Sequence, residues 1–194
     1  MGESRGSIGF FTTYRPSIPL DIFSCPIPPL PLSANSEELL TDGVSYNQNC
    51  RPVPPAALKE LLVFLGKKNP ELAARCGATP EDAVAGRVTG LVFVSERDDG
   101  LETLCVALHS KGRGGDAAVL SLAEIYGAGT FGGARMEDSG CIAGGFTAGG
   151  RAVGHSLVYV STKESSRTRR TPWTVVYMTN LADGKTERLT PPGN

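Results

Sequence analysis

The chain has 194 residues, of which 40% are hydrophobic and 20% are charged, and its formal net charge is −1 at pH 7. This length and composition fit one substantial globular domain, or two small ones, with a hydrophobic core. A net charge so close to zero provides no broad basic surface, so neither nucleic acid nor a membrane is expected as a partner.

The cysteine pattern and the absence of targeting signals bear on compartment. The five cysteines are scattered and form no Cys-x-x-Cys pair: Cys25, Cys50, Cys76, Cys105 and Cys141. Such spacing is unlike a disulfide framework or a zinc site, so we expect reduced structural thiols. The opening residues are polar, no apolar run approaches the roughly 18 residues of a membrane span, and no Asn-x-Ser/Thr sequon is present. These features predict a soluble, cytoplasmic protein.

In chain order, the first predicted elements are two strands, over residues 8–14 and 20–25. Both segments are rich in aromatic and β-branched side chains. The segment from Cys25 to Asn35 contains four prolines, which cannot lie inside a sheet. We therefore expect an extended surface loop there.

Residues 54–86 depart from strand patterning and are predicted to form a helical insert between repeat units. A first helix is expected over 56–65, ending at Gly66, because four leucines recur on one helical face: Leu58, Leu61, Leu62 and Leu65. A second short helix is expected to close at Gly77. A third should begin at Thr79, an N-cap residue followed by proline and two acidic residues.

The other strands repeat one pattern: an apolar strand, a variable loop, a second apolar strand, a turn and then Leu-Thr. The fullest copy covers residues 156–190, the first covers 8–43, and a partial copy without the Leu-Thr tag covers 91–108. Without about 33 inserted residues, the first interval between copies is about 50 residues, close to the roughly 40–50 residues of a propeller blade. The repetition predicts one supersecondary unit stacked several times.

Two of the repeated strands carry apolar residues toward both sides. Residues 91–94 are all apolar, and within residues 173–178 Trp, Val and Tyr alternate with Thr, Val and Met. We expect little water on either face of these strands, as in stacked sheets. The pairs Asp99-Gly100 and Asp183-Gly184 are typical of tight hairpin turns.

These strands, turns and tags together resemble the TolB-like β-propeller repeats, which are of the WD40-like kind. The same repeats form the N-terminal propeller of dipeptidyl peptidase IV and prolyl oligopeptidase type enzymes. The matching segments are Leu40–Asn47, Leu91–Arg97, Leu157–Ser161 and Leu189–Pro192. More specifically, the chain is similar to the opening portion of plant proteins in which a helical insert precedes a Val-Phe-Val-Ser-Glu-Arg strand.

The resemblance implies a mainly β fold, a partial β-propeller of two to three blades with a small α-helical insert. A first propeller-type unit is expected over residues 1–53, the insert over 54–86 and further units over 87–194. Closed propellers typically have four to eight blades, so the chain is expected to be a fragment or truncated member of the family. Open sheet edges would leave backbone groups unpaired, which predicts self-association.

The resemblance further implies a non-catalytic interaction module that binds a protein partner and needs no cofactor. The peptidase members owe their activity to an α/β-hydrolase domain that follows the propeller, and nothing in this sequence corresponds to that domain. The alternative interpretation is the propeller part of a longer serine hydrolase or peptidase whose catalytic domain is absent here.

One glycine-rich segment has the spacing of a nucleotide site. Residues 127–132 match a dinucleotide-binding loop, but such a loop must open a helix and be followed about 20 residues later by an acidic residue. The segment that follows, residues 133–140, has a composition that disfavours a helix, and no carboxylate lies between Gly140 and Glu164. We expect flexible loops here, with one weak strand near residues 141–143.

The segment Asp138-Ser139-Gly140 resembles the nucleophile region of trypsin-like proteases, but Glu137 stands where that family has glycine. Neither His109 nor His155 has that family's sequence context, and the Gly-x-Ser-x-Gly elbow is absent. A triad is defined by geometry rather than by sequence order, so a Ser, His and Asp constellation stays open at this point. We expect no catalytic residue.

Two acidic or metal-type patterns also favour a structural explanation. Cys105 and His109 are four apart, which on a strand places them about 13 Å from each other, too far to share an ion. The carboxylates near the Asp99-Gly100 turn lack the spacing of a calcium loop: Asp98, Asp99 and Glu102. We therefore expect no metal.

The one strongly basic run covers residues 163–173 and contains Trp173. A solvated loop between two strands is the favoured interpretation. The alternative is a contact loop, since arginine beside tryptophan is a common anchor at protein interfaces.

Overall fold

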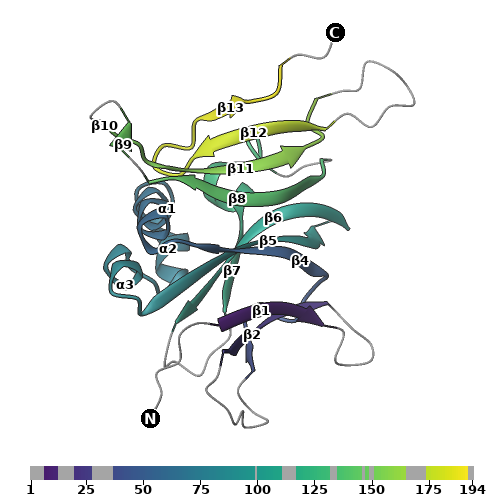
Figure 1. Cartoon of the computed structure of the whole chain (residues 1–194), viewed down its shortest axis with the longest axis vertical. Helices are drawn as coiled ribbons and strands as arrows, with labels where there is room; N and C mark the ends of the chain where they lie inside the picture. Colours follow the sequence, from purple (N-terminus) through teal and green to yellow (C-terminus); the bar gives the residue numbers. More distant parts are fainter. Residues whose placement is uncertain are drawn as a thin grey trace.

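The computed structural model describes residues 7–12, 20–27, 37–98, 100–110, 117–131, 135–145, 147–148, 151–164 and 174–191. Within these residues the fold is mainly β, as expected, with three antiparallel sheets, one short hairpin and four helices (Figure 1). None of the three sheets closes on itself. No helix in the described segments combines the length and the apolar character that crossing a membrane requires.

The first sheet contains three strands in chain order: β1 (Ser7–Thr12), β2 (Asp21–Pro26) and β3 (Glu38–Leu39). The first two strands lie where their aromatic and β-branched content predicted them. Of the proline-rich loop expected from Cys25 to Asn35, the beginning belongs to β2, and residues 28–36 lie outside the described residues.

The middle sheet contains four strands in the order of the chain: β4 (Asn47–Val53), β5 (Val88–Asp98), β6 (Leu101–Ser110) and β7 (Ala118–Ser121). The turn between β5 and β6 passes through Gly100, whose φ of +70° suits glycine. The expected hairpin is therefore present, although Asp99 lies outside the described residues.

Three helices follow β4: α1 (Pro55–Lys68), α2 (Pro70–Cys76) and α3 (Pro80–Val84). The four expected leucines of α1 are buried. Gly66 does not end α1, contrary to expectation; the helix ends before Pro70, whose ring disfavours helical geometry in the residue ahead of it. The predicted closure at Gly77 and N-cap at Thr79 are both confirmed.

The position of these helices differs from the prediction that they separate two repeat units. Val53 at the end of β4 pairs with Gly90 in β5, so the chain leaves and re-enters one sheet at adjacent points. The helices therefore interrupt the middle sheet. Antiparallel pairing tolerates a long connection here because the two strand ends already lie side by side.

The last sheet has the order β13-β12-β11-β8 and contains β8 (Glu137–Gly144), β11 (His155–Ser161), β12 (Val175–Asn180) and β13 (Thr186–Arg188). The hairpin β9 (Thr147–Ala148) and β10 (Arg151–Ala152) extends between β8 and β11. The short helix α4 (Leu122–Tyr126) leads from the middle sheet toward the last. The weak strand expected near residues 141–143 is confirmed as part of β8.

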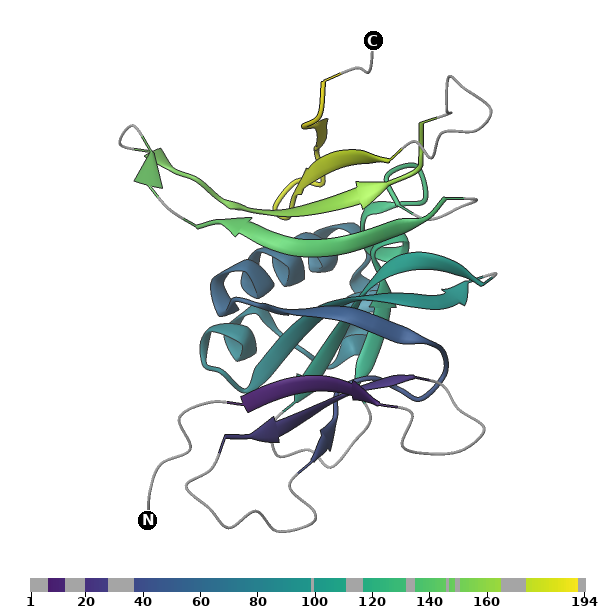
Figure 2. The same ribbon diagram turned by 45° about the vertical axis from the view of Figure 1, so that its right-hand side comes forward.

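The three sheets are stacked in chain order, with the first and last at opposite ends and α1 beside the middle and last sheets (Figure 2). A hydrophobic cluster between the middle and last sheets joins α1 residues to both sheets, for example Leu61, Val92 and Tyr159. A smaller cluster between the first and middle sheets contains Ile22 and Phe93. Val92 and Phe93 point to opposite clusters, which confirms that residues 91–94 are covered on both faces.

The equivalent expectation for residues 173–178 is wrong for one face. Val175 and Tyr177 are 1% and 5% exposed and face the middle sheet, whereas Val176 and Met178 are only partly buried. Trp173 lies outside the described residues. The alternating pattern is the same as in a doubly covered strand, but only one side of the last sheet is packed against another sheet.

Candidate functional site

The first Leu-Thr tag closes the first sheet by two hydrogen bonds to one residue of β2. The Leu40 N–H donates to the Ile22 carbonyl at 2.8 Å, and the Ile22 N–H donates to the Thr41 hydroxyl oxygen at 3.1 Å. Thr41 is only 1% exposed. Its side chain therefore supplies an acceptor at the point where the strand backbone no longer provides one.

The second tag repeats this arrangement in the last sheet. The Leu189 N–H donates to the Val176 carbonyl at 2.8 Å, and the Val176 N–H donates to the Thr190 hydroxyl oxygen at 3.3 Å. The middle sheet has no tag, and its last strand instead ends at Ser121, whose hydroxyl oxygen accepts from Glu124 N–H to open α4. The two Leu-Thr tags recognised in the sequence therefore make equivalent hydrogen bonds to an adjacent strand.

A partly buried polar network joins the first tag to the middle sheet. The Asp21 carboxylate accepts from the Thr41 hydroxyl at 2.8 Å, from Gly43 N–H at 3.2 Å and from the Asn47 amide at 3.2 Å. Asn47 is fully buried and accepts in turn from the Ser95 hydroxyl at 2.8 Å. Because unpaired buried polar groups are costly, this network sets how the two sheets lie against each other.

Arg97 adds a partly buried ion pair to the same junction. Its guanidinium donates to both carboxylate oxygens of Asp42, at 2.9 and 3.0 Å, and its Nε donates to Ser95 at 3.1 Å. A bidentate ion pair of this kind is both strong and directional. The Val-Phe-Val-Ser-Glu-Arg segment therefore contacts the Leu-Thr-Asp-Gly segment, a link that sequence reasoning missed because 55 residues separate the partners.

The last sheet has a different arrangement at the corresponding place. Ser161 is fully buried and accepts from Lys163 N–H at 3.2 Å. The Lys163 ammonium lies 3.6 Å from the ring centroid of Tyr177 and 3.3 Å from the Tyr159 hydroxyl. Burial lowers the pKa of Lys163, and burial together with a hydrogen bond to Glu164 raises the pKa of Tyr177 to about 12. An aromatic surface therefore contacts the Lys163 ammonium, and the charges of Glu137 and Glu164 act on it as well.

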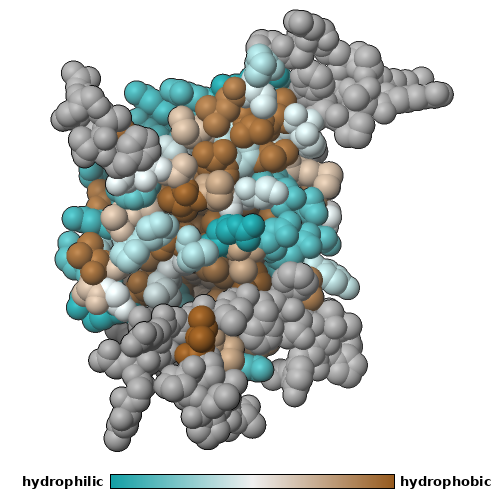
Figure 3. All heavy atoms as spheres, viewed as in Figure 1, coloured by the Kyte–Doolittle hydropathy of each residue, from teal (hydrophilic) through white to brown (hydrophobic). Residues whose placement is uncertain are grey.

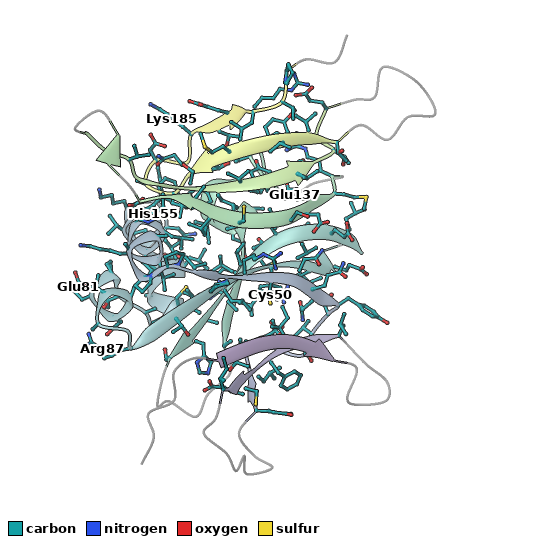
Figure 4. The ribbon with its side chains drawn as sticks, viewed as in Figure 1. Cys50, Glu81, Arg87, Glu137, His155 and Lys185 are labelled. Carbon is teal, nitrogen blue, oxygen red and sulfur yellow. The ribbon has the colours of Figure 1, made fainter. Side chains whose placement is uncertain are left out.

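Both histidines lie beside glutamates of other elements. His109 Nε2 on β6 lies 3.2 Å from the Glu38 carboxylate on β3, which joins the middle and first sheets. His155 opens β11 and binds Glu60 on α1 twice, through its backbone N–H and its Nδ1, both at 2.9 Å (Figure 4). The Nε2 of His155 lies against Gly145, where even a Cβ would collide. Each imidazole is thus occupied by a structural carboxylate.

The serine singled out in the sequence is not brought to either histidine. Ser139 is exposed, with a φ of +56°, and neighbouring Asp138 accepts from the Asn49 amide at 2.9 Å. The two imidazoles are committed to glutamates on other elements. The described residues therefore supply no hydrogen-bonded Ser, His and Asp arrangement of the kind a triad requires.

The nucleotide-type loop also has the wrong context. Gly127 follows helix α4 and does not open a helix, and its backbone N–H donates to Ala123 as the end of that helix. Residues 132–134 lie outside the described residues. A dinucleotide-binding loop needs the opposite order, with a strand before it and a helix after it.

Nothing in the described segments groups three or more His, Cys, Asp or Glu side chains that could hold a metal ion. Cys105 is fully buried between the first and middle sheets at the middle of β6, and His109 lies near the end of the same strand. Burial raises the pKa of Glu102, which accepts from the Gln48 amide at 3.2 Å. Of the basic run, residues 165–173 lie outside the described residues.

All five cysteines lie in described segments, and none forms a disulfide, as expected. Cys141 on β8 is exposed, whereas Cys76 and Cys105 are buried.

Comparison of the chain with known protein families, with curated proteins and with solved structures finds no significant match.

Proposed function

We propose that this chain is a non-catalytic protein-interaction module built from three consecutive units of a partial, TolB-like β-propeller. The observation that carries the proposal is the recurrence of one unit: the middle and last sheets each have four antiparallel strands whose spatial order follows the chain. Propeller blades are four-stranded sheets of this kind, repeated about one axis. The first sheet, with three strands, supplies a shorter copy of the same unit.

The register within the sheets supports the same equivalence. The first residue of β4, Asn47, pairs with Ser95, and the first residue of β8, Glu137, pairs with Ser161. All four are buried to 0% exposure. A buried polar residue opposite the serine of a Val-x-Val-Ser segment is thus a shared feature of both four-stranded sheets.

The arrangement of polar groups favours binding over catalysis. Polar side chains are used between sheets, where Asp21, Asn47 and Arg97 hold one unit against the next. The histidines have carboxylate partners on other elements, and the shifted pKa values of Tyr177 and Asp82 are explained by packing and helix capping. Repeat architectures of stacked sheets offer extended surfaces for partners.

Activity measurements test the non-catalytic part of the proposal. The purified chain is expected to show no labelling by a fluorophosphonate probe and no turnover of peptide or ester substrates, with a known serine hydrolase as the positive control. In native co-purification, a protein partner is expected to co-elute with the chain. Stoichiometric labelling of one serine, lost on mutation of that serine, would contradict the proposal.

The second candidate is the propeller part of a longer serine hydrolase or peptidase. It is favoured only by the resemblance of the repeats to those enzymes' N-terminal propeller. Immunoblotting of natively expressed protein separates the two candidates. A species well above 20.4 kDa whose sequence continues into a hydrolase domain would favour this second function.

A further inference from the structure

The residue ahead of the first strand makes the same backbone contact in both four-stranded sheets. Tyr46 directly precedes β4, and its carbonyl accepts from the Glu96 N–H at 3.1 Å. Met136 directly precedes β8, and its carbonyl accepts from the Thr162 N–H at 3.0 Å. Glu96 and Thr162 each follow the serine that pairs with the first residue of the strand. Tyr46 and Met136 therefore occupy equivalent positions in the two sheets.

Both of these side chains are large and exposed. Tyr46 is 49% exposed and Met136 45%, and Val44, two residues ahead of Tyr46, is 68% exposed. The strands β4 and β8 pack against each other, the Asn49 amide donates to Asp138 at 2.9 Å, and both strands begin on the same side of the molecule (right in Figure 2). The repeat therefore brings these side chains to one end of the stack, whereas exposed apolar residues are ordinarily scattered.

Three carboxylates belong to the same end: Glu96 on β5, Glu102 on β6 and Asp138 on β8. Glu102 accepts from the Gln48 amide at 3.2 Å. Burial, together with the charges of Asp138 and Glu96, raises the pKa of Glu102, so the three carboxylates lie near enough to repel one another. Among the described residues, the Glu96 side chain has no hydrogen-bond or ion-pair partner.

The cations at this end leave the carboxylates in excess. The charge of Arg97 is balanced by the bidentate contact with Asp42, and Arg135 donates to the Gly129 carbonyl at 3.3 Å. Figure 3 shows strongly hydrophilic residues gathered on this side of the molecule, at the right, with apolar residues beside them. Within the described segments these carboxylates do not group to hold a metal ion. A negative surface with exposed apolar side chains is complementary to a positively charged partner that has apolar side chains of its own.

We call this surface the rim patch, and it consists of Val44, Tyr46, Glu96, Glu102, Met136 and Asp138. We propose that the rim patch is the docking surface for a basic peptide segment of a partner protein, one that carries arginine or lysine together with apolar side chains. The inference rests on the proposed function, to which it adds the place of binding and the chemical class of the partner. Tyrosine and methionine are enriched at protein interfaces, and methionine adapts its shape to what it contacts.

A phage-displayed library of random dodecapeptides tests the proposal. Peptides selected on the purified chain, after depletion on the double variant Tyr46→Ala/Glu96→Gln, are expected to be rich in arginine or lysine with leucine or aromatic residues. Fluorescence anisotropy of a selected peptide should show about tenfold weaker binding to Tyr46→Ala and to Met136→Ala. Glu96→Gln should weaken binding and reduce its dependence on salt, because it removes one charge from the surface.

Val84→Ala and Glu81→Gln are the matched controls. Both residues are exposed on α3, Val84 to 60%, on the opposite side of the molecule from the start of β8 (Glu81 and Glu137 in Figure 4). These variants should bind the selected peptide like the unmodified chain. Circular dichroism monitors folding, and Glu96→Gln, which keeps the side-chain size, serves if a truncated variant does not fold.

Three results would overturn the proposal: a library that yields no peptide, selected peptides without basic residues, or binding that all three rim-patch variants leave unchanged. A co-purified protein that is retained by the rim-patch variants would also overturn it, while the interaction module itself would stand. Fluorophosphonate labelling tests the absence of catalysis separately, so failure here is distinguishable from failure of the proposed function.

Discussion

Single hydroxyl groups at the two tags have a clear structural purpose. Thr41 and Thr190 each accept from a backbone N–H of the adjacent strand, so that the strand's end is satisfied inside the sheet. Thr41 additionally donates to Asp21, which is itself the acceptor of a three-donor network. The two threonines are therefore equivalent in the backbone contact and unequal in the side-chain contact.

Replacement of the tag threonines by valine tests this difference. Thr190→Val should lower the free energy of unfolding by about 1 kcal/mol, and Thr41→Val by about 1–3 kcal/mol, because it also leaves buried groups unpaired. Urea denaturation measures both values, and the loss at Thr41 is expected to be the larger. Thr→Ser at the same positions retains the hydroxyl and is the control, and a loss at Thr41 no larger than that at Thr190 would contradict the role assigned to Asp21.

The capping box of α3 provides a pH dependence at one residue. Hydrogen bonds from the Thr79 side chain, from Arg87 and from the Thr79 backbone lower the pKa of Asp82 to about 2. An unfolded aspartate has a pKa of about 3.9, so the ionised form contributes stability above that pH, and the contribution is lost as pH falls toward 2. Asp82→Asn should flatten the acid limb of unfolding free energy against pH between about 4 and 2. An unchanged slope would contradict this.

At the scale of elements, some boundaries of the helical insert follow from local sequence signals and others depend on packing. The N-cap at Thr79 and the closure at Gly77 follow from contacts within a few residues, so they are readable in the sequence. Gly66 was expected to end α1 but does not. The buried leucines around it keep that segment helical, and Pro70 determines where the helix ends.

Two glycine-to-alanine substitutions separate the effect of backbone flexibility on stability from the effect of steric crowding. Gly66→Ala should raise the free energy of unfolding by up to about 1 kcal/mol, because Gly66 is inside α1 with open space around it. Gly90→Ala should lower it, since the new Cβ would lie 2.9 Å from Leu58 and 3.2 Å from Val53. Thermal and urea unfolding of both variants check the signs, and a stabilising Gly90→Ala would refute the close approach of α1 to β5.

At the scale of the whole molecule, the stacking of the sheets gives the same sequence pattern a different burial in each sheet. Val92 and Val158 occupy the same register position in two consecutive sheets, but Val92 is buried in the core and Val158 is only partly buried. A charge placed in a core costs several kcal/mol or more, whereas a charge on a part-exposed face remains hydrated.

The same substitution at these two positions should therefore have opposite outcomes. Val92→Glu is expected to abolish cooperative folding, while Val158→Glu should retain a sharp melt and the near-ultraviolet circular dichroism of the unmodified chain. Thermal unfolding followed at both wavelengths is the measurement. Comparable destabilisation by the two variants would show that Val158 is as buried as Val92, contrary to the burial described.

The sequence by itself determined the mainly β class, the strands, the hairpin glycines and the helix caps, because each depends on periodicity or on contacts between near neighbours. It also revealed the repeated tags. Only the tertiary structure decided that β4 and β5 share a sheet across the helical insert, that Arg97 pairs with Asp42, and that the histidines bind glutamates. The burial of each strand was also decided by the tertiary structure. An apolar strand is covered on one face or on both depending on which sheets pack against it, and a local sequence pattern does not specify those sheets.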